Sequence, residues 1–112
     1  MRKIEAIVRA ESFDVVKRTL EEKGYFGMTV SHVERRGRQK GLRLQQRSGE
    51  FDVDLIPKLK VELVVLDEDA SAVLRALATA ARTGDIGDGK IFVIPVEDAL
   101  RIRTGESGMD AV

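Results

Sequence analysis

Residues 58–66 read KLKVELVVL, and this stretch decides the fold through its place in the chain. Apolar and polar residues alternate along it, which is the period of a β-strand with one buried face. The regular segment before it, MTVSHVER at 28–35, also reads as a strand, and no helical pattern lies between the two. Two strands therefore follow one another in the middle of the chain. The side chains expected to point inward from 58–66 are Leu59, Val61, Leu63 and Val65.

One strand and one helix are predicted on either side of this central pair. RKIEAIVR at 2–9 alternates as a strand and is followed by a helix that ends near Gly24. A second helix ends near Gly84, and IFVIPV at 91–96 and a brief last strand around LRIR at 100–103 follow it. This order is an α+β, ferredoxin-like βαββαβ arrangement with both helices on one face of the sheet. The expected helix N-caps are Ser12 and either Asp69 or Ser71.

The other face of the predicted sheet carries a mixed set of side chains. It is too apolar to be simply solvated and too charged to be an ordinary core. We therefore expect an oligomer interface, a ligand site, or both on this face. Its expected members are Lys3, Glu5, Ile7, Arg9, Thr29, Val33, Lys58, Glu62 and Val64.

Length and composition indicate one soluble domain covering residues 1–112. Basic and acidic residues number 19 each, and this neutral balance argues against a dedicated nucleic-acid binder. The chain has no cysteine, which excludes disulfides, thiolate zinc sites and cysteine nucleophiles. The first residues, MRKIEAIVRA, contain no long apolar run, so neither a signal peptide nor a membrane span is expected, and a cytoplasmic location follows.

The segment GDIGDGKI at 84–91 has the G-x-x-x-x-G-K spacing of a phosphate-binding P-loop, but Ile91 stands where Ser or Thr should hold magnesium. A P-loop runs from strand to helix, whereas this turn runs from helix to strand, so an enzyme of the P-loop type is disfavoured. The local chemistry still suits phosphates, because glycines allow close backbone approach and Lys90 adds a charge. Arg101 and Arg103 would share one face if extended. Alternatively, the segment is a helix C-cap and surface turn with solvated cations.

A long polar segment separates the strands predicted at 28–35 and 58–66. Connections of more than about 12–15 residues without regular structure are uncommon in compact domains and are usually functional or disordered. The segment could bind an anion near its base and a partner at its tip, or it could be a mobile hairpin whose charges only keep it soluble. The basic residues in and beside it are Arg35, Arg36, Arg38, Lys40, Arg43 and Arg47.

Four blocks of sequence resemble the PII signal-transduction family: GMTV at 27–30, GRQKG at 37–41, DLIPKLKVELVV at 54–65 and ARTGDIGDGKIFVIPVEDALRIRTGE at 81–106. The resemblance covers nearly the whole chain. It implies a ferredoxin-like homotrimer that binds ATP or ADP in clefts between subunits. It also implies that 2-oxoglutarate binds beside the nucleotide through Mg²⁺. A protruding T-loop, here at about 37–55, would dock on transporters and enzymes of nitrogen metabolism.

The resemblance also implies roles for individual residues. The phosphates would contact the turn at 87–90 and residues at the base of the T-loop, and two arginines would close on them from the last strand. Adenine and ribose would lie against the open sheet face. The implied nucleotide-binding residues are Ile7, Thr29, Gly37, Arg38, Glu62, Val64, Gly87, Asp88, Gly89, Lys90, Arg101 and Arg103.

For 2-oxoglutarate, the resemblance implies Gln39 as the magnesium ligand through its amide oxygen and Lys58 as the partner of the distal carboxylate. Gly37, Lys40 and Gly41 would add backbone contacts. An oxygen-rich shell that keeps some water is what magnesium prefers.

The T-loop departs from the common pattern of the family. Phe51 stands where many bacterial members carry a tyrosine that is uridylylated, and Gly49 replaces a serine that some members phosphorylate, which leaves Ser48 nearby. The loop is more similar to divergent, archaeal-type members, so regulation by ligands alone is expected. Arg47 matches a loop-tip arginine that plugs Amt-type ammonium transporters, and such a transporter is the first partner expected. Membrane association would come only through that partner.

Other functions remain open from the sequence. A PII-like adenylate sensor that ignores 2-oxoglutarate and regulates a different transporter or nitrogenase has the same nucleotide chemistry. An RNA-recognition module shares the strand order, but such modules stack bases on aromatic residues of the central strands, and KIEAIVR and KLKVELVV contain none. The lone His32 has no catalytic grouping around it in the sequence, so a regulator rather than an enzyme is expected.

Overall fold

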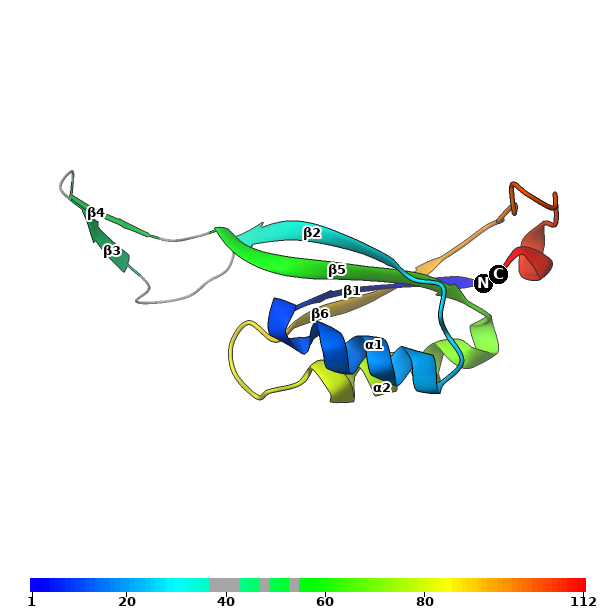
Figure 1. Cartoon of the computed structure of the whole chain (residues 1–112), viewed down its shortest axis with the longest axis horizontal. Coiled ribbons are helices and arrows are strands. Elements are labelled where there is room, and N and C mark those ends of the chain that lie inside the picture. The colour runs from blue at the N-terminus through cyan, green and yellow to red at the C-terminus, as the bar shows by residue number, and fades with distance from the viewer. Residues whose placement is uncertain (37–42, 47–48, 53–54) are drawn as a thin grey trace.

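The computed structural model describes residues 1–36, 43–46, 49–52 and 55–112. Four antiparallel strands form one sheet in the order β2-β5-β1-β6, and two helices cover one of its faces (Figure 1). This arrangement confirms the predicted α+β, ferredoxin-like fold. The strands are β1 (Arg2–Val8), β2 (Thr29–Arg36), β5 (Leu55–Val65) and β6 (Gly89–Pro95), and the helices are α1 (Phe13–Glu22) and α2 (Asp67–Ala81).

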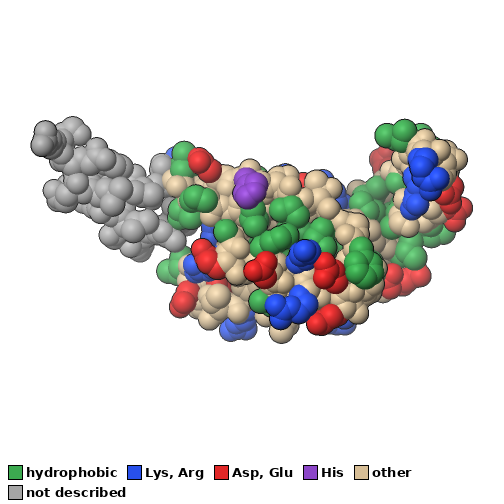
Figure 2. Space-filling view, viewed as in Figure 1, with side chains coloured by type: hydrophobic (Ala, Val, Ile, Leu, Met, Phe, Trp, Pro, Cys, Tyr) green, Lys and Arg blue, Asp and Glu red, His purple; other side chains and the backbone are tan. Residues whose placement is uncertain are grey.

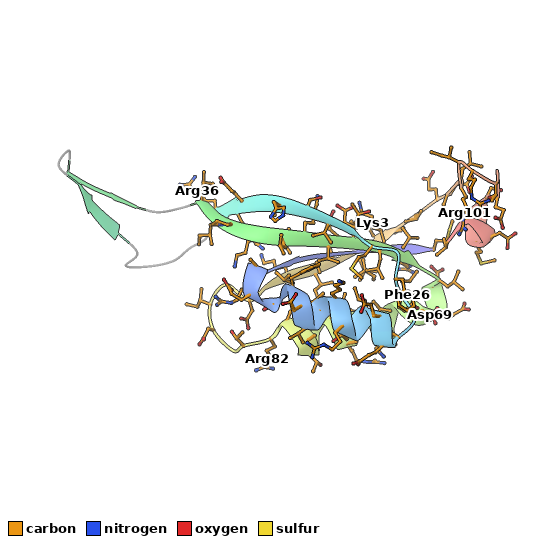
Figure 3. All side chains as sticks on the ribbon, viewed as in Figure 1. Lys3, Phe26, Arg36, Asp69, Arg82 and Arg101 are labelled. Atoms are coloured by element: carbon orange, nitrogen blue, oxygen red, sulfur yellow. The ribbon has the colours of Figure 1, made fainter. Side chains whose placement is uncertain are left out.

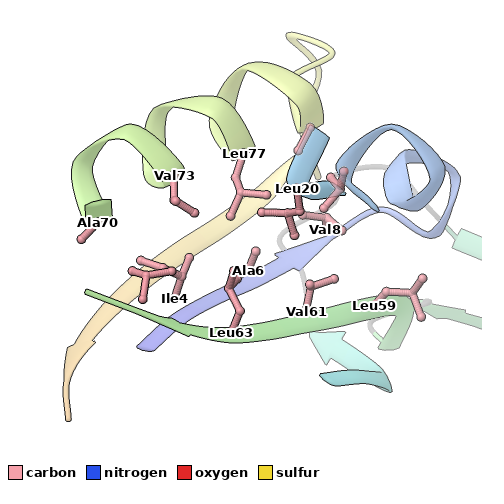
Figure 4. Close-up of a cluster of buried hydrophobic side chains, with 13 residues drawn as sticks. Ile4, Ala6, Val8, Leu20, Leu59, Val61, Leu63, Ala70, Val73 and Leu77 are labelled. Carbon is pink, nitrogen blue, oxygen red and sulfur yellow. The ribbon is translucent and has the colours of Figure 1, made fainter. Parts of the chain in front are cut away.

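The hydrophobic core lies between the two helices and the sheet (Figure 4). Alternate residues of the two central strands β1 and β5 point into it, as the period-2 pattern predicts. The helices contribute one apolar stripe each. The buried residues from the strands are Ile4, Ala6, Val8, Leu59, Val61, Leu63 and Val65, and those from the helices are Val16, Leu20, Ala70, Val73, Leu77 and Ala81.

The predicted N-cap position is confirmed for the first helix and wrong for the second. A short 3-10 helix, η1 (Ala10–Ser12), precedes α1, and Ser12 at the N-cap position makes no capping hydrogen bond through its side chain. The second helix begins at Asp67, earlier than either predicted cap, with Leu66 at the N-cap position. Its first turn is instead stabilised by acidic side chains near the positive end of the helix dipole. One of them, Asp67, also accepts a hydrogen bond of 2.8 Å from the amino group of Met1.

The segment predicted as a long loop contains a hairpin of two short strands, β3 (Arg43–Gln46) and β4 (Gly49–Asp52). In Figure 1 this hairpin lies beyond the ends of β2 and β5. In the part of the chain that the structure describes, no helix is long and apolar enough to cross a membrane.

The brief last strand predicted at 100–103 is wrong. Leu100 forms a single β-bridge with Ser107, and the chain between them folds into a turn in which the Gly105 N–H donates to the Arg101 carbonyl at 2.8 Å. Another 3-10 helix, η2 (Gly108–Ala111), follows. A short strand needs a neighbouring strand to satisfy its backbone, and the order β2-β5-β1-β6 places none beside these residues. The segment from Glu97 onward therefore stands apart from the sheet as a separate lobe (Figure 2).

Candidate functional site

The turn between α2 and β6 is closed by the carboxylate of Asp88. Its Oδ2 atom accepts hydrogen bonds from the backbone N–H groups of Thr83 and Gly84, both at 2.8 Å, and Oδ1 accepts one from the Thr83 hydroxyl. Arg9 Nε donates to Oδ1 at 3.2 Å from the end of β1. These hydrogen bonds, the Thr83 hydroxyl first among them, hold the pKa of Asp88 well below its usual range. Asp88 is therefore charged, and its oxygens are engaged within the turn.

Two basic side chains hold the carbonyl groups of this turn. Arg9 Nη2 donates to the carbonyl of Ile86, and Lys58 Nζ donates to that of Gly87. Lys58 is only 7% exposed, and this burial, together with the positive charge of Arg9, lowers the pKa of Lys58. The C=O and N–H of a trans peptide point in opposite directions, so anchoring the Ile86 carbonyl turns the Gly87 N–H away from Arg9. No acceptor for that N–H occurs among the described residues.

Glycine is required where this turn enters β6. Gly87 and Gly89 have φ angles of +101° and +111°, which residues with a side chain rarely adopt. A Cβ atom on Gly89 would lie 1.8 Å from the carbonyl oxygen of Ile7, so the backbones of β1 and the turn touch directly. Lys90 follows on β6, opposite Ile7, and is exposed. An outward N–H, a surface without side chains and a nearby ammonium group can together bind an anion such as a phosphate.

A separate groove of about 360 Å³ lies on the other side of the sheet, where β2 meets β5. It contains three of the residues predicted to frame adenine and ribose, namely Thr29, Glu62 and Val64. Lys60 and Lys3 form ion pairs with Glu62 at 3.2 and 3.3 Å, and these contacts, that of Lys60 first, lower the pKa of Glu62. The groove is thus lined by both charged and apolar residues. Its remaining residues are Lys3, Gly27, Met28 and Leu63.

Several of the predicted nucleotide-binding residues therefore fall into two groups within one chain, named the phosphate half-site and the base half-site for the parts of the nucleotide that the sequence predicts there. The phosphate half-site is the turn at 87–90, and the base half-site is the groove with Thr29 and Glu62. Ile7 was predicted to frame adenine and ribose, but it lies opposite Lys90, next to the turn and outside the groove. Thr29 lies on edge strand β2 and Lys90 on edge strand β6, and these two strands are three strand spacings, about 14 Å, apart across the sheet. Ion pairs among Lys3, Glu5, Lys60 and Glu62 occupy the open face between them.

Arg101 and Arg103 do not reach the turn within their own chain. The length of β6 separates the turn from the C-terminal lobe by about 20 Å at 3.3 Å per residue. Figure 3 shows the separation: Arg101 lies in the lobe at one end of the sheet, and Arg82, which leads into the turn, lies at the other. The lobe also exposes apolar side chains, with Ile102 between the two arginines 95% exposed. The predicted convergence of these arginines on the turn does not occur within one chain.

The sequence did not indicate Arg9 and Thr83 as parts of the site. Arg9 was expected only on the open face, although it directly follows Val8, which pairs with Leu59, and this register brings it next to Lys58. Thr83 lies five residues before Asp88, a spacing that suits a closed turn. The predicted residues Gly37, Arg38, Gln39, Lys40, Gly41 and Arg47 lie outside the described residues.

The described ranges contain no group of three or more His, Asp or Glu side chains that could hold a metal ion. The predicted magnesium ligand, Gln39, is among the residues that the structure does not describe.

Comparison with known proteins identifies the family of the chain. The family model described as Nitrogen regulatory protein P-II matches residues 1–106. Over 112 residues, the chain is 53% identical to Nitrogen regulatory protein P-II of Rhizobium meliloti, covering 100% of both chains. It is also 53% identical to Nitrogen regulatory protein P-II 1 of Methanothermobacter thermautotrophicus, covering 100% of this chain and 97% of the relative. The family model covers nearly the whole chain and both relatives match all of it, so the chain belongs to the P-II family of nitrogen regulatory proteins.

Proposed function

We propose that this protein is a nucleotide-responsive regulator that binds ATP or ADP in clefts between the subunits of a homotrimer. The observation that carries the proposal is the turn at 83–90, in which Arg9 and Lys58 hold two carbonyls and the Gly87 N–H is left without an acceptor among the described residues. Gly87, Gly89 and Lys90 would bind the phosphates there, with Asp88 closing the turn. The RNA-recognition alternative is set aside by the family to which the chain belongs.

The separation of the half-sites supports assembly from several chains. One chain would supply the turn, and a neighbour would supply the base groove together with Arg101 and Arg103. Both arginines are exposed in a lobe that leaves the body of its own chain, and exposed apolar side chains on β6 and the lobe need a covering surface. These side chains include Phe92, 44% exposed, and Leu100, 66% exposed. Cyclic symmetry would then generate three equivalent clefts.

The effector proposed beside ATP is 2-oxoglutarate with Mg²⁺. Lys58 and Arg9 place two positive groups against Gly87, within 3.4 and 3.3 Å of the position of a Cβ atom there, and such a pair suits a carboxylate. Gln39 would bind the Mg²⁺ ion between ATP and 2-oxoglutarate. ADP would form no such link to 2-oxoglutarate through the metal ion. Ligand occupancy would thereby shift the populations of the T-loop, because ligands stabilise the arrangement that they bind better.

Calorimetric titration tests the effector site. With MgATP present, 2-oxoglutarate is expected to bind the wild-type protein, and without nucleotide it is not. Gln39→Ala should lose 2-oxoglutarate binding and keep most ADP binding, because the amide serves the metal and not the diphosphate. Equal loss of both ligands would contradict this division of roles. If ATP binds but 2-oxoglutarate never does, the protein is an adenylate sensor of a different transporter or of nitrogenase.

The proposed partner is an Amt-type ammonium transporter, bound through the T-loop with Arg47 at the contact. Co-purification with such a transporter is expected in ADP and is expected to fall when MgATP and 2-oxoglutarate replace ADP. Arg47→Ala should abolish the complex, whereas Arg75→Ala on α2 should leave it intact. A wild-type protein that fails to co-purify in ADP would argue for another nitrogen-metabolism partner.

A further inference from the structure

We propose that Arg9 is a positioning residue of the phosphate-binding turn. It would set the affinity for nucleotide phosphates through the Ile86 carbonyl and the Asp88 carboxylate, without touching the phosphates. The inference rests on the proposed nucleotide function and adds to it a residue at the end of β1, on the opposite side of the turn from the anion.

The contacts of Arg9 connect the two ends of the turn. Its Nε atom donates to Asp88, whose other hydrogen bonds hold Thr83 and Gly84, and its Nη2 atom donates to Ile86. One planar guanidinium therefore fixes a carboxylate and a carbonyl at the same time, which a single ammonium cannot do in the same geometry. The side chain of Arg9 is 26% exposed, so it is held against the turn and is not extended into solvent.

The direction of the Ile86–Gly87 peptide shows why Arg9 would act indirectly. The guanidinium lies on the carbonyl side of this peptide, and the Gly87 N–H points the opposite way. An anion that binds the N–H therefore lies across the peptide from Arg9. Without Arg9, the peptide could rotate, and the Gly87 N–H would then have to be oriented when the phosphate binds. Preorganisation of this kind raises affinity by removing an ordering cost from the binding step.

The test compares ADP with adenosine, without Mg²⁺ and 2-oxoglutarate, in wild-type protein and in Arg9→Met, Arg9→Lys and Arg75→Met. Binding is followed by NMR titration, and thermal unfolding reports whether each variant folds. Arg9→Met is expected to bind ADP about tenfold more weakly, because the Gly87 N–H would have to be ordered when the phosphate binds. Adenosine affinity should not change, because adenosine has no phosphate to bind the turn. Arg75→Met, which changes an arginine on α2 away from the turn, should match the wild type for both ligands.

Arg9→Lys separates positioning from charge. Lysine keeps the positive charge but lacks the planar guanidinium that donates to two acceptors at once. Arg9→Lys should therefore recover at most about half of the ADP affinity that Arg9→Met loses, on a logarithmic scale. Full recovery would show that charge alone matters and would overturn the inference, as would unchanged ADP binding by Arg9→Met or equal losses for ADP and adenosine. Should Arg9→Met fail to fold, Arg9→Gln takes its place with the same expectations. A wild-type protein that binds no ADP would overturn the proposed function, and this inference with it.

Discussion

Replacing Gly89 by alanine is expected to destabilise the protein by about 3 kcal/mol or more, since the new methyl group meets backbone and the backbone is left-handed. The Cβ atom would lie 1.8 Å from the Ile7 carbonyl oxygen, which belongs to the central strand β1 and cannot move without disturbing the sheet. The φ angle of +111° adds strain of its own. Urea unfolding measures the effect. Because the turn would be displaced, ADP binding by any folded fraction should also be lost.

Gly24→Ala is the matched control for this variant. Gly24 also has a positive φ, +87°, but a Cβ atom there would have no heavy atom within 4 Å. Gly24→Ala should therefore lower the free energy of unfolding only by the strain of the left-handed backbone, about 1–2 kcal/mol. If Gly24→Ala and Gly89→Ala destabilise the protein equally, the close approach of the turn to β1 is not what makes Gly89 necessary.

The second large effect is expected in the double variant Arg101→Ala/Arg103→Ala. This double variant should have an affinity for ADP and ATP that is lower by about a hundredfold or more, because two hydrogen bonds to charged phosphates would be lost. This is expected although both arginines lie at the far end of the sheet from the turn in their own chain, since they would act on the turn of a neighbour. Arg75→Ala should leave nucleotide affinity unchanged in the same titration. Wild-type affinity in the double variant would remove the C-terminal lobe from the site.

The arrangement of strands and helices was predictable from the sequence because every second residue of β1 from Ile4 onward and of β5 from Leu59 onward is apolar. Residues such as Ile4, Val61 and Leu63 have only one face on which to be buried, and they are buried there. Helix starts were less predictable, because a cap depends on hydrogen bonds that several nearby residues could make. Asp67 was missed for this reason: its role near the helix start includes an ion pair with the amino group of Met1, 66 residues away.

The chemistry of the turn was predictable, but its construction was not. Glycines and a lysine at 87–90 indicate an anion site from their residue types alone. The contribution of Arg9 depends on strand register, which places the end of β1 beside Lys58 and the turn. The position of Arg101 was wrongly predicted. The prediction assumed an extended segment, in which two arginines spaced two residues apart share one face. Here the segment is a turn with no neighbouring strand of its own chain.

The central claim is that each nucleotide site combines the turn of one chain with the groove and arginines of another. Mixing two defective variants tests it most directly. Lys90→Glu damages only the turn, and Arg101→Ala/Arg103→Ala damages only the lobe, so neither homotrimer should bind ADP appreciably. When the two are unfolded together in equal amounts and refolded, every mixed trimer regains one intact site, and about a quarter of the wild-type number of ADP sites should return with wild-type affinity. No recovery in mixed trimers confirmed by native mass spectrometry would contradict the claim, because it would place the turn and the arginines in the same site of a single chain.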